Sequence, residues 1–159
     1  MSLAKTFYLL KDAELRTGEL YALIGLSIAV TRPGLSDLFN ELAEEEGLHA
    51  RQVELLRNVF LQSEDVFLEN PEAERAIGEF MQNVDMIKNY FNRHYAQLQA
   101  ADLINLALDI ERGLVERHRT FFFQVSDPLI KTLFSSLNLA DEAHLRRLES
   151  FKGGMEPKG

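Results

Sequence analysis

Apolar residues recur along this chain at intervals of three and four, which is the spacing of one face of an α-helix. Period-two alternation, the pattern of a half-buried strand, is nearly absent, so the chain is predicted to be all-α. Proline is rare and falls at expected helix boundaries, because the first turn of a helix tolerates it. The pattern predicts four long helices and a further helix between the second and the third. Their expected ranges are residues 3–30, 34–62, 72–98, 101–125 and 129–151.

Short turns join the first two long helices and the last two, so each pair is expected to form an antiparallel hairpin. The long middle connection, with its own helix over residues 72–98, allows the two hairpins to pack as a four-helix bundle with a crossover rather than in simple up-and-down order. A chain of 159 residues has the length of one domain, which we place at residues 1–152, followed by a flexible tail at 153–159.

Each of the four long helices carries an apolar stripe that is interrupted by an acidic residue. These acids are Glu14, Glu46, Glu111 and Asp141. Residues three or four positions apart share a helix face, so the four carboxylates are expected to point into the core. An unpaired buried carboxylate costs several kcal/mol, and four close together also repel each other. The acids must therefore take up protons or share cations.

A histidine follows the second and the fourth of these acids by three residues, at His49 and His144. Both histidines have a Phe ten residues earlier and a Leu seven residues earlier, and the internal repeat extends over about residues 5–62 and 101–151. Three residues make nearly one helical turn, so acid and imidazole share a face. Two acid–histidine pairs, each preceded by a lone acid on another helix, have the layout of a two-metal site inside a helical bundle.

Two divalent ions carry four positive charges, which match four carboxylates, and two neutral imidazoles complete the ligand set. The predicted metal ligands are Glu14, Glu46, His49, Glu111, Asp141 and His144. Oxygen and nitrogen donors without thiolate suit iron, manganese or zinc. The chain has no cysteine, which excludes iron–sulfur clusters, thiolate zinc sites and cysteine nucleophiles.

Other acids near the histidines leave an alternative register open. Glu45 lies four residues before His49, and Glu142 lies two residues before His144. Only the three-residue spacing occurs in both halves of the repeat, so Glu46 and Asp141 are preferred as ligands. Glu44 and Glu45 are predicted to be solvated or to contact the ligands from outside.

Tyr21 and His118 take matching places, each seven residues after the lone acid of its helix. Both could hydrogen-bond metal ligands, or both could serve only in packing, and the sequence favours neither. His94 has no matched acid and is interpreted as an ordinary polar residue of the middle helix. Glu19 falls off the first stripe and is predicted to lie at the surface.

The net charge of −8 argues against nucleic acid and against an anionic membrane as main partners. The longest apolar run, residues 21–30, is too short to cross a bilayer, which takes about 20 residues. The first residues lack the layout of a secretory signal, so a cytoplasmic location is expected. No glycine-rich nucleotide loop is present in the sequence.

The six predicted ligands resemble those of the ferritin-like di-iron carboxylate proteins, and most of all the rubrerythrin branch. The strings Leu-Ala-Glu-Glu-Glu-x-x-His and Leu-Ala-Asp-Glu-Ala-His, ending at His49 and His144, carry the likeness, as does Tyr21 seven residues after Glu14. The resemblance implies a ferritin-like four-helix bundle of two antiparallel hairpins with the extra helix in the crossover. It also implies Glu14 and Glu111 as lone acids, and Glu46–His49 and Asp141–His144 as the paired motifs.

Three features depart from that family. Asp141 stands where Glu is usual and is one methylene shorter, so it is expected to reach only one metal or to bind from one side. Rubrerythrins usually carry a second Glu in the third long helix, three residues from the first, and here Leu108 and Leu114 take those places. The chain also lacks the Cys-rich domain that delivers electrons in rubrerythrin, so an electron donor must be a separate protein or small molecule.

The resemblance implies a di-iron oxidoreductase of the peroxidase type that reduces hydrogen peroxide or dioxygen, with zinc or manganese as alternatives to iron. A second interpretation is an iron-binding or metal-binding protein without turnover, which the shorter Asp141 and the missing third-helix glutamate favour. A third is a bundle that has lost its metal and serves as an interaction module. The middle helix has enough apolar residues to cover the bundle or to meet a second subunit, and a homodimer is expected.

Overall fold

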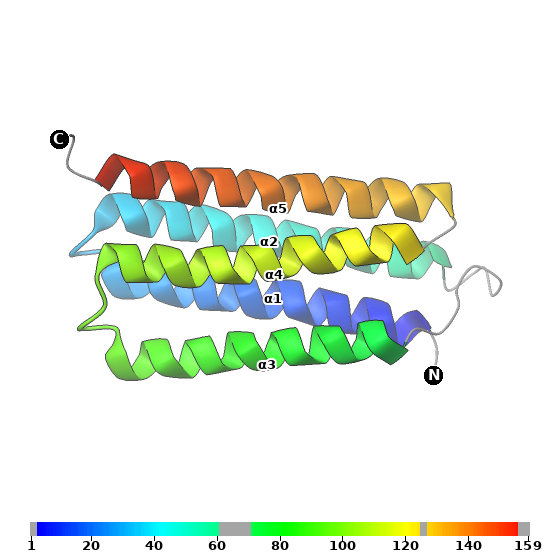
Figure 1. The fold of residues 1–159 in the computed structure, drawn as a ribbon, viewed down its shortest axis with the longest axis horizontal. Coiled ribbons are helices and arrows are strands. Elements are labelled where there is room, and N and C mark those ends of the chain that lie inside the picture. Colours follow the sequence, from blue (N-terminus) through cyan, green and yellow to red (C-terminus); the bar gives the residue numbers. More distant parts are fainter. Residues whose placement is uncertain (1–2, 61–70, 125–126, 156–159) are drawn as a thin grey trace.

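The computed structural model describes residues 3–60, 71–124 and 127–155, and these residues form five α-helices without a strand (Figure 1). The helices are α1 (Leu3–Ile28), α2 (Pro33–Phe60), α3 (Pro71–His94), α4 (Ala100–Gln124) and α5 (Pro128–Met155). Proline is the first residue of α2, α3 and α5, where its missing N–H costs no hydrogen bond. The predicted all-α class is confirmed for the described part of the chain.

Several predicted helix ends are off by a few residues. α1 ends at Ile28 rather than Val30, because the amides of Thr31 and Arg32 both bond to the carbonyl of Ile28 and turn the chain. The middle helix ends at His94 instead of extending to Leu98, and tight turns occupy the residues between.

The predicted start of the tail at residue 153 is also wrong, because α5 continues through two glycines to Met155. A glycine lowers helix propensity without forbidding the helical conformation. The predicted ends at Gln62 and Val125, and the tail beyond residue 155, lie outside the described residues.

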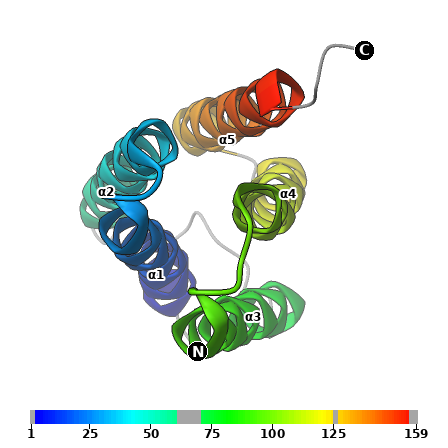
Figure 2. The same ribbon diagram turned by 90° about the vertical axis from the view of Figure 1, so that its left-hand side faces the viewer.

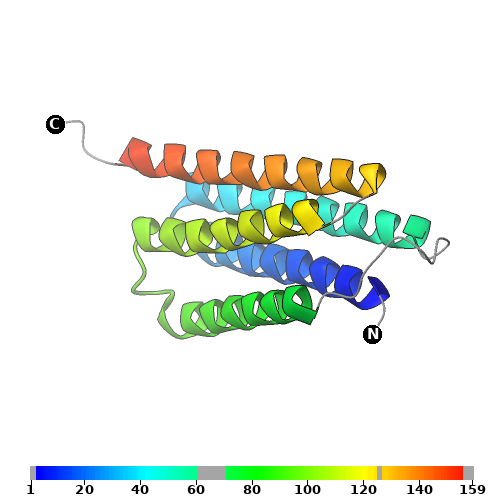
Figure 3. The same ribbon diagram turned by 45° about the vertical axis from the view of Figure 1, so that its right-hand side comes forward.

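The helices pack as two hairpins with a fifth helix on one side. Seen end-on, α1, α2, α5 and α4 occupy the corners of a bundle, and α3 lies outside it against α1 and α4 (Figure 2). The most extensive packing is within α1–α2 and α4–α5, which form antiparallel hairpins as predicted. α2 and α4 run in the same direction along the bundle, because α3 carries the chain back between them (Figures 1 and 3).

The predicted apolar stripes face the interior. Phe39 and Phe134, the matched phenylalanines of the repeat, are 0% and 1% exposed. α3 covers one side of the bundle with an apolar face that includes Ile77, Phe80 and Val84. Phe151, the last stripe residue of α5, is only partly buried. None of the helices described here is long and apolar enough to cross a lipid bilayer.

The hairpin α1–α2 packs closely at Gly18. A methyl group added there would lie 3.2 Å from the carbonyl oxygen of Ala43 and 3.2 Å from Cβ of Glu46. The first atom is part of the α2 backbone and the second is bonded directly to it, so neither can move away without a shift of the helix. We expect Gly18→Ala to lower the free energy of unfolding by about 1 kcal/mol or more, although alanine is the better helix former. Chemical denaturation measures the change.

Gly47 in α2 provides the matched control, because a methyl group added at that position meets nothing within 4 Å. Gly47→Ala is expected to raise the free energy of unfolding by about 0.5–1 kcal/mol through helix propensity alone. A gain of stability in both variants would contradict the close approach at Gly18.

Candidate metal centre

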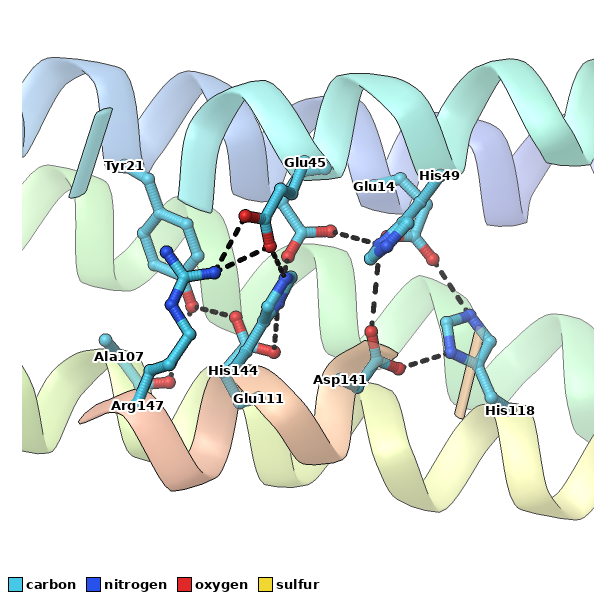
Figure 4. Close-up of polar contacts among 11 residues, drawn as sticks. Glu14, Tyr21, Glu45, His49, Ala107, Glu111, His118, Asp141, His144 and Arg147 are labelled. Carbon is cyan, nitrogen blue, oxygen red and sulfur yellow. Dashed lines mark hydrogen bonds and ion pairs between the residues drawn. The ribbon is translucent and has the colours of Figure 1, made fainter. Parts of the chain in front are cut away.

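The predicted acids and histidines gather in the interior between the two hairpins (Figure 4). α1 and α4 each supply one acid, while α2 and α5 each supply an acid and a histidine. Each of these side chains belongs to a residue that is 5% exposed or less. The structure thus brings together all six residues that the repeat singles out. They are Glu14, Glu46, His49, Glu111, Asp141 and His144.

One group of donors surrounds Nδ1 of His49. This nitrogen lies 3.3 Å from Oε2 of Glu46, 3.7 Å from Oε2 of Glu14 and 3.8 Å from Oδ1 of Asp141. Glu14, Glu46 and His49 each place one donor atom within 4.8 Å of the others, which is close enough to hold a metal ion. We call this group the His49 position.

A second group surrounds Nδ1 of His144. This nitrogen lies 3.1 Å from Oε1 of Glu46 and 3.2 Å from Oε2 of Glu111. Glu46, Glu111, Asp141 and His144 place one donor atom each within 4.8 Å of one another. We call this group the His144 position.

The two positions share carboxylates. Glu46 directs Oε2 towards His49 and Oε1 towards His144, so its two oxygens face two different imidazoles. Asp141 belongs to the His144 position and also approaches His49. The His49 and His144 rings stack with centroids 5.4 Å apart at an angle of 20°. A carboxylate that directs one oxygen to each of two imidazoles could contribute to both donor groups.

Several carboxylate oxygens in the centre have no aligned hydrogen-bond donor. They are Oε2 of Glu14, Oε1 of Glu46 and Oδ1 of Asp141. Oε1 of Glu14 also lacks an aligned donor, and its close partner is the His118 ring, through an ion-pair contact. Buried acceptors without partners are costly, and native proteins nearly always satisfy them. These orphaned oxygens point among the same histidines, so a cation between them would satisfy several at once. The donor set therefore fits a metal ion, and buried Glu, Asp and His groups here could hold one.

Tyr21 and His118 both contact predicted ligands, which resolves the alternative that the sequence left open. The hydroxyl of Tyr21 donates to Oε1 of Glu111 at 2.7 Å. His118 is fully buried, with Nδ1 2.5 Å from Oδ2 of Asp141 and Nε2 2.8 Å from Oε1 of Glu14. Each residue therefore reaches the lone acid of the opposite hairpin.

Glu45 contacts the centre from outside. One of its oxygens lies 2.7 Å from Nε2 of His144, on the side of the ring that faces away from the acids. Arg147 donates to both oxygens of Glu45, at 2.7 Å and 2.8 Å (Figure 4). It also donates to Glu41 at 2.8 Å. A carboxylate on the outer nitrogen fixes the orientation of an imidazole ligand.

The remaining alternatives are also placed. Glu142 accepts a hydrogen bond from Asn138 within α5 and takes no part in the two donor groups. Glu44 and Glu19 are exposed, as predicted, and Glu19 pairs with Lys88. His94 contacts Tyr90 within α3, with ring centroids 4.6 Å apart and the ring planes tilted by 40°. Arg147 was missed from the sequence, although its spacing of three residues from His144 puts it on the next turn.

Protons compensate the charges of the metal-free centre. Burial would lower the pKa of His49, but its neighbours Glu14 and Glu46 outweigh burial and raise that pKa to about 10. The same competition raises the pKa of His144 to about 11, through Glu111 and Glu46. Burial raises the pKa of Asp141 to about 6 against the opposing charge of His118. At pH 7 both histidines therefore carry protons that a metal ion has to displace.

The other pKa shifts follow the same logic. Burial would lower the pKa of His118, but the charges of Asp141 and Glu14 raise it well above its usual value. Burial would raise the pKa of Glu14, but the charge of His118 lowers it. Burial and the charge of Glu111 together raise the pKa of Glu46 well above 4.5. Glu46 would therefore be stabilised in its charged form by a neighbouring cation.

No protein-family model matches the chain, and no curated protein and no solved structure is significantly similar to it. Its function has to be inferred from the chemistry of the site.

Metal binding is expected to release protons and to tighten as the pH rises. A ligating imidazole must be neutral, whereas His49 and His144, with pKa values of about 10 and 11, hold protons at pH 7. Each displaced proton makes the apparent affinity about tenfold higher per pH unit below these values. Calorimetric titration with Zn²⁺ in buffers of different ionisation enthalpy, between about pH 6 and pH 8, counts the released protons. Binding that releases none would contradict this charge state.

Proposed function

We propose that the chain is a ferritin-like di-metal carboxylate protein, and that with two iron ions bound it reduces hydrogen peroxide or dioxygen. The observation that carries the proposal is the convergence of six oxygen and nitrogen ligands from four helices on two adjoining donor groups with shared carboxylates. Four buried acids without such ions would be a costly arrangement.

The direction of the helices supports the ferritin-like assignment. α2 and α4 run the same way, and α3 carries the chain between the two hairpins (Figure 1). This order distinguishes a crossover bundle from an up-and-down bundle. A sequence resemblance to rubrerythrins favours iron over zinc and manganese and favours hydrogen peroxide as the substrate.

Each side chain of the centre has a defined task in this proposal. Glu14, Glu46 and His49 would hold one ion, and Glu46, Glu111, Asp141 and His144 would hold the other. When bound, the two iron ions would supply the electrons that reduce an oxygen–oxygen bond. Tyr21 holds one oxygen of Glu111 by donating a hydrogen bond from its hydroxyl group, and Glu45 orients His144. The apolar stripes on either side exclude water from the buried acids.

Electrons have to come from outside the chain. No thiolate is present to hold an electron-carrying cluster, since the sequence has no cysteine. The proposal therefore includes a separate electron donor. Independently of that, we propose that the chain forms a homodimer.

Oxidation of loaded ferrous iron tests the proposal directly. The protein is loaded anaerobically with Fe²⁺, peroxide is added, and near-ultraviolet absorbance follows formation of ferric iron. We expect two irons per chain to be oxidised faster than free Fe²⁺. Glu19→Gln, at an exposed residue that belongs to neither donor group, should react like the parent protein, whereas His144→Ala should not. Oxidation no faster than that of free Fe²⁺ would rule out the proposed reaction.

A metal-holding protein without turnover is the second candidate. It is favoured by Leu108 and Leu114, which are buried at the places where rubrerythrins carry a further glutamate. Among the described residues, α4 brings only the Glu111 carboxylate to the two donor groups. Repeated peroxide consumption with an added reductant separates the candidates, because a metal-holding protein would oxidise its iron once and stop.

A further inference from the structure

The two halves of the repeat place different side chains beside the centre. Tyr21 follows Glu14 by seven residues, and His118 follows Glu111 by seven. A tyrosine hydroxyl can donate one hydrogen bond, and that of Tyr21 donates to Glu111. An imidazole has two ring nitrogens, and His118 directs one to Asp141 and the other to Glu14. The His118 ring therefore engages two carboxylates of the centre, where Tyr21 engages one.

This contact takes oxygen atoms away from the His49 position. Oε1 of Glu14 and Oδ2 of Asp141 face His118, which leaves Oε2 and Oδ1 for the metal. These two remaining oxygens lie 3.7 Å and 3.8 Å from Nδ1 of His49. The corresponding oxygens of Glu46 and Glu111 lie only 3.1 Å and 3.2 Å from Nδ1 of His144. Oε2 of Glu46 lies closer to His49, at 3.3 Å, so two of the three acid oxygens around His49 are farther from the imidazole than those of Glu46 and Glu111 are from His144.

The two imidazoles also differ in how they are held. The outer nitrogen of His144 is fixed by Glu45, and Glu45 in turn accepts two hydrogen bonds from Arg147. Within the described part of the chain, every polar contact of His49 is made by Nδ1, and none fixes its outer nitrogen. An imidazole whose orientation is fixed beforehand loses less freedom when it binds a metal.

We propose that the two metal positions are unequal: the His144 position binds first and more tightly, and His118 weakens the His49 position by holding Oε1 of Glu14, which belongs to that position alone. His118 is a positioning residue in this scheme, since it acts through that carboxylate. The inference rests on the proposed di-metal centre, and it adds an order of filling and a residue that sets that order.

Equilibrium titration with Co²⁺, followed by its visible absorption spectrum, tests the order of filling. Co²⁺ alone is the probe, and no reductant or peroxide is present. The parent protein should bind two ions per chain in two steps whose dissociation constants differ by about tenfold or more. His49→Ala should keep the tighter step and bind one ion, while His144→Ala should lose the tighter step. The two variants remove the same group at matching places of the repeat and serve as controls for each other.

The role of His118 is tested in the same titration. His118→Leu should release Oε1 of Glu14, which only the His49 position uses, and tighten the second step by about tenfold. The first step, whose group shares only Asp141 with His118, should change by less than about threefold. His118→Gln can still hold one carboxylate and should give an intermediate second step, with circular dichroism confirming that both variants are folded. A general loss of structure would weaken both Co²⁺-binding steps. A change in the affinity of the second step alone therefore shows that His118 positions the carboxylate of that site.

The outcomes separate this inference from the proposed function. Two ions bound with equal affinity, or loss of the tighter step in His49→Ala, would overturn the inference and leave a di-metal protein. An unchanged second step in both His118 variants would overturn the role of His118. A chain that binds no Co²⁺ would overturn the inference together with the proposed function.

Discussion

Metal loading is expected to raise the midpoint of thermal unfolding by about 10 °C or more. An ion that binds only the folded chain stabilises it by about 4 kcal/mol when its concentration is a thousand times the dissociation constant. For a chain of this size, each kcal/mol shifts the midpoint by about 2–4 °C. The four buried acids and two histidines come together only in the folded chain, so an ion held by them binds the folded chain and not the unfolded one. Calorimetric melts with Mn²⁺ or Zn²⁺, and again after chelation, measure the shift.

His144→Ala is the control for this experiment, because it removes a buried ligand without changing the acidic surface. The shift on metal addition should fall to less than half in this variant. An equal shift in the parent and in the variant would mean that the ions bind to exposed acids rather than to the centre.

Glu46→Gln is expected to have opposite effects with and without metal. Glu46 offers one oxygen to each of the two positions, whereas the amide has a single, uncharged oxygen. Metal affinity should therefore fall by about 100-fold or more, since both ions lose a charged ligand. Competition with a coloured chelator measures the loss. Glu44→Gln, an exposed carboxylate two residues away, should leave the affinity unchanged.

Without metal, the same substitution should stabilise the fold by about 1–3 kcal/mol at pH 7, the range for one buried polar group. Burial and Glu111 raise the folded-state pKa of Glu46 well above 4.5, so above pH 4.5 folding has to protonate this carboxyl or bury its charge. Glutamine has neither cost. The gain should shrink as the pH falls through 4.5 and disappear below it, where Glu46 is protonated in both states. Urea unfolding of the metal-free proteins at both pH values checks this, and a loss of stability at pH 7 would contradict it.

The sequence predicted the helices and the inward direction of the acids because helix geometry alone decides both. A carboxylate at the three-or-four spacing of an apolar stripe has to face the core, whatever the partner helix is. The repeat then identified Glu46 with His49 and Asp141 with His144 as matching pairs. All of them lie in the two donor groups.

Contacts between helices could not be predicted in the same way. The pairs Arg147–Glu45 and His118–Asp141 join residues of different helices, 102 and 23 positions apart. Which of them meet depends on how each helix is rotated against its neighbour, and periodicity within a helix carries no information on that rotation. Helix ends such as His94 were missed because single backbone turns decide them.

The two lines along which the hairpins meet differ in chemistry. On one side the apolar face of α3 packs across α1 and α4. On the other side α2 and α5 are bridged by Arg147 with Glu41 and Glu45 at partly exposed positions. Ionic strength screens exposed charges but leaves apolar packing intact. If the two hairpins separate, α2 and α5 should therefore move apart first, while α3 keeps α1 and α4 together. Added salt should favour this separation.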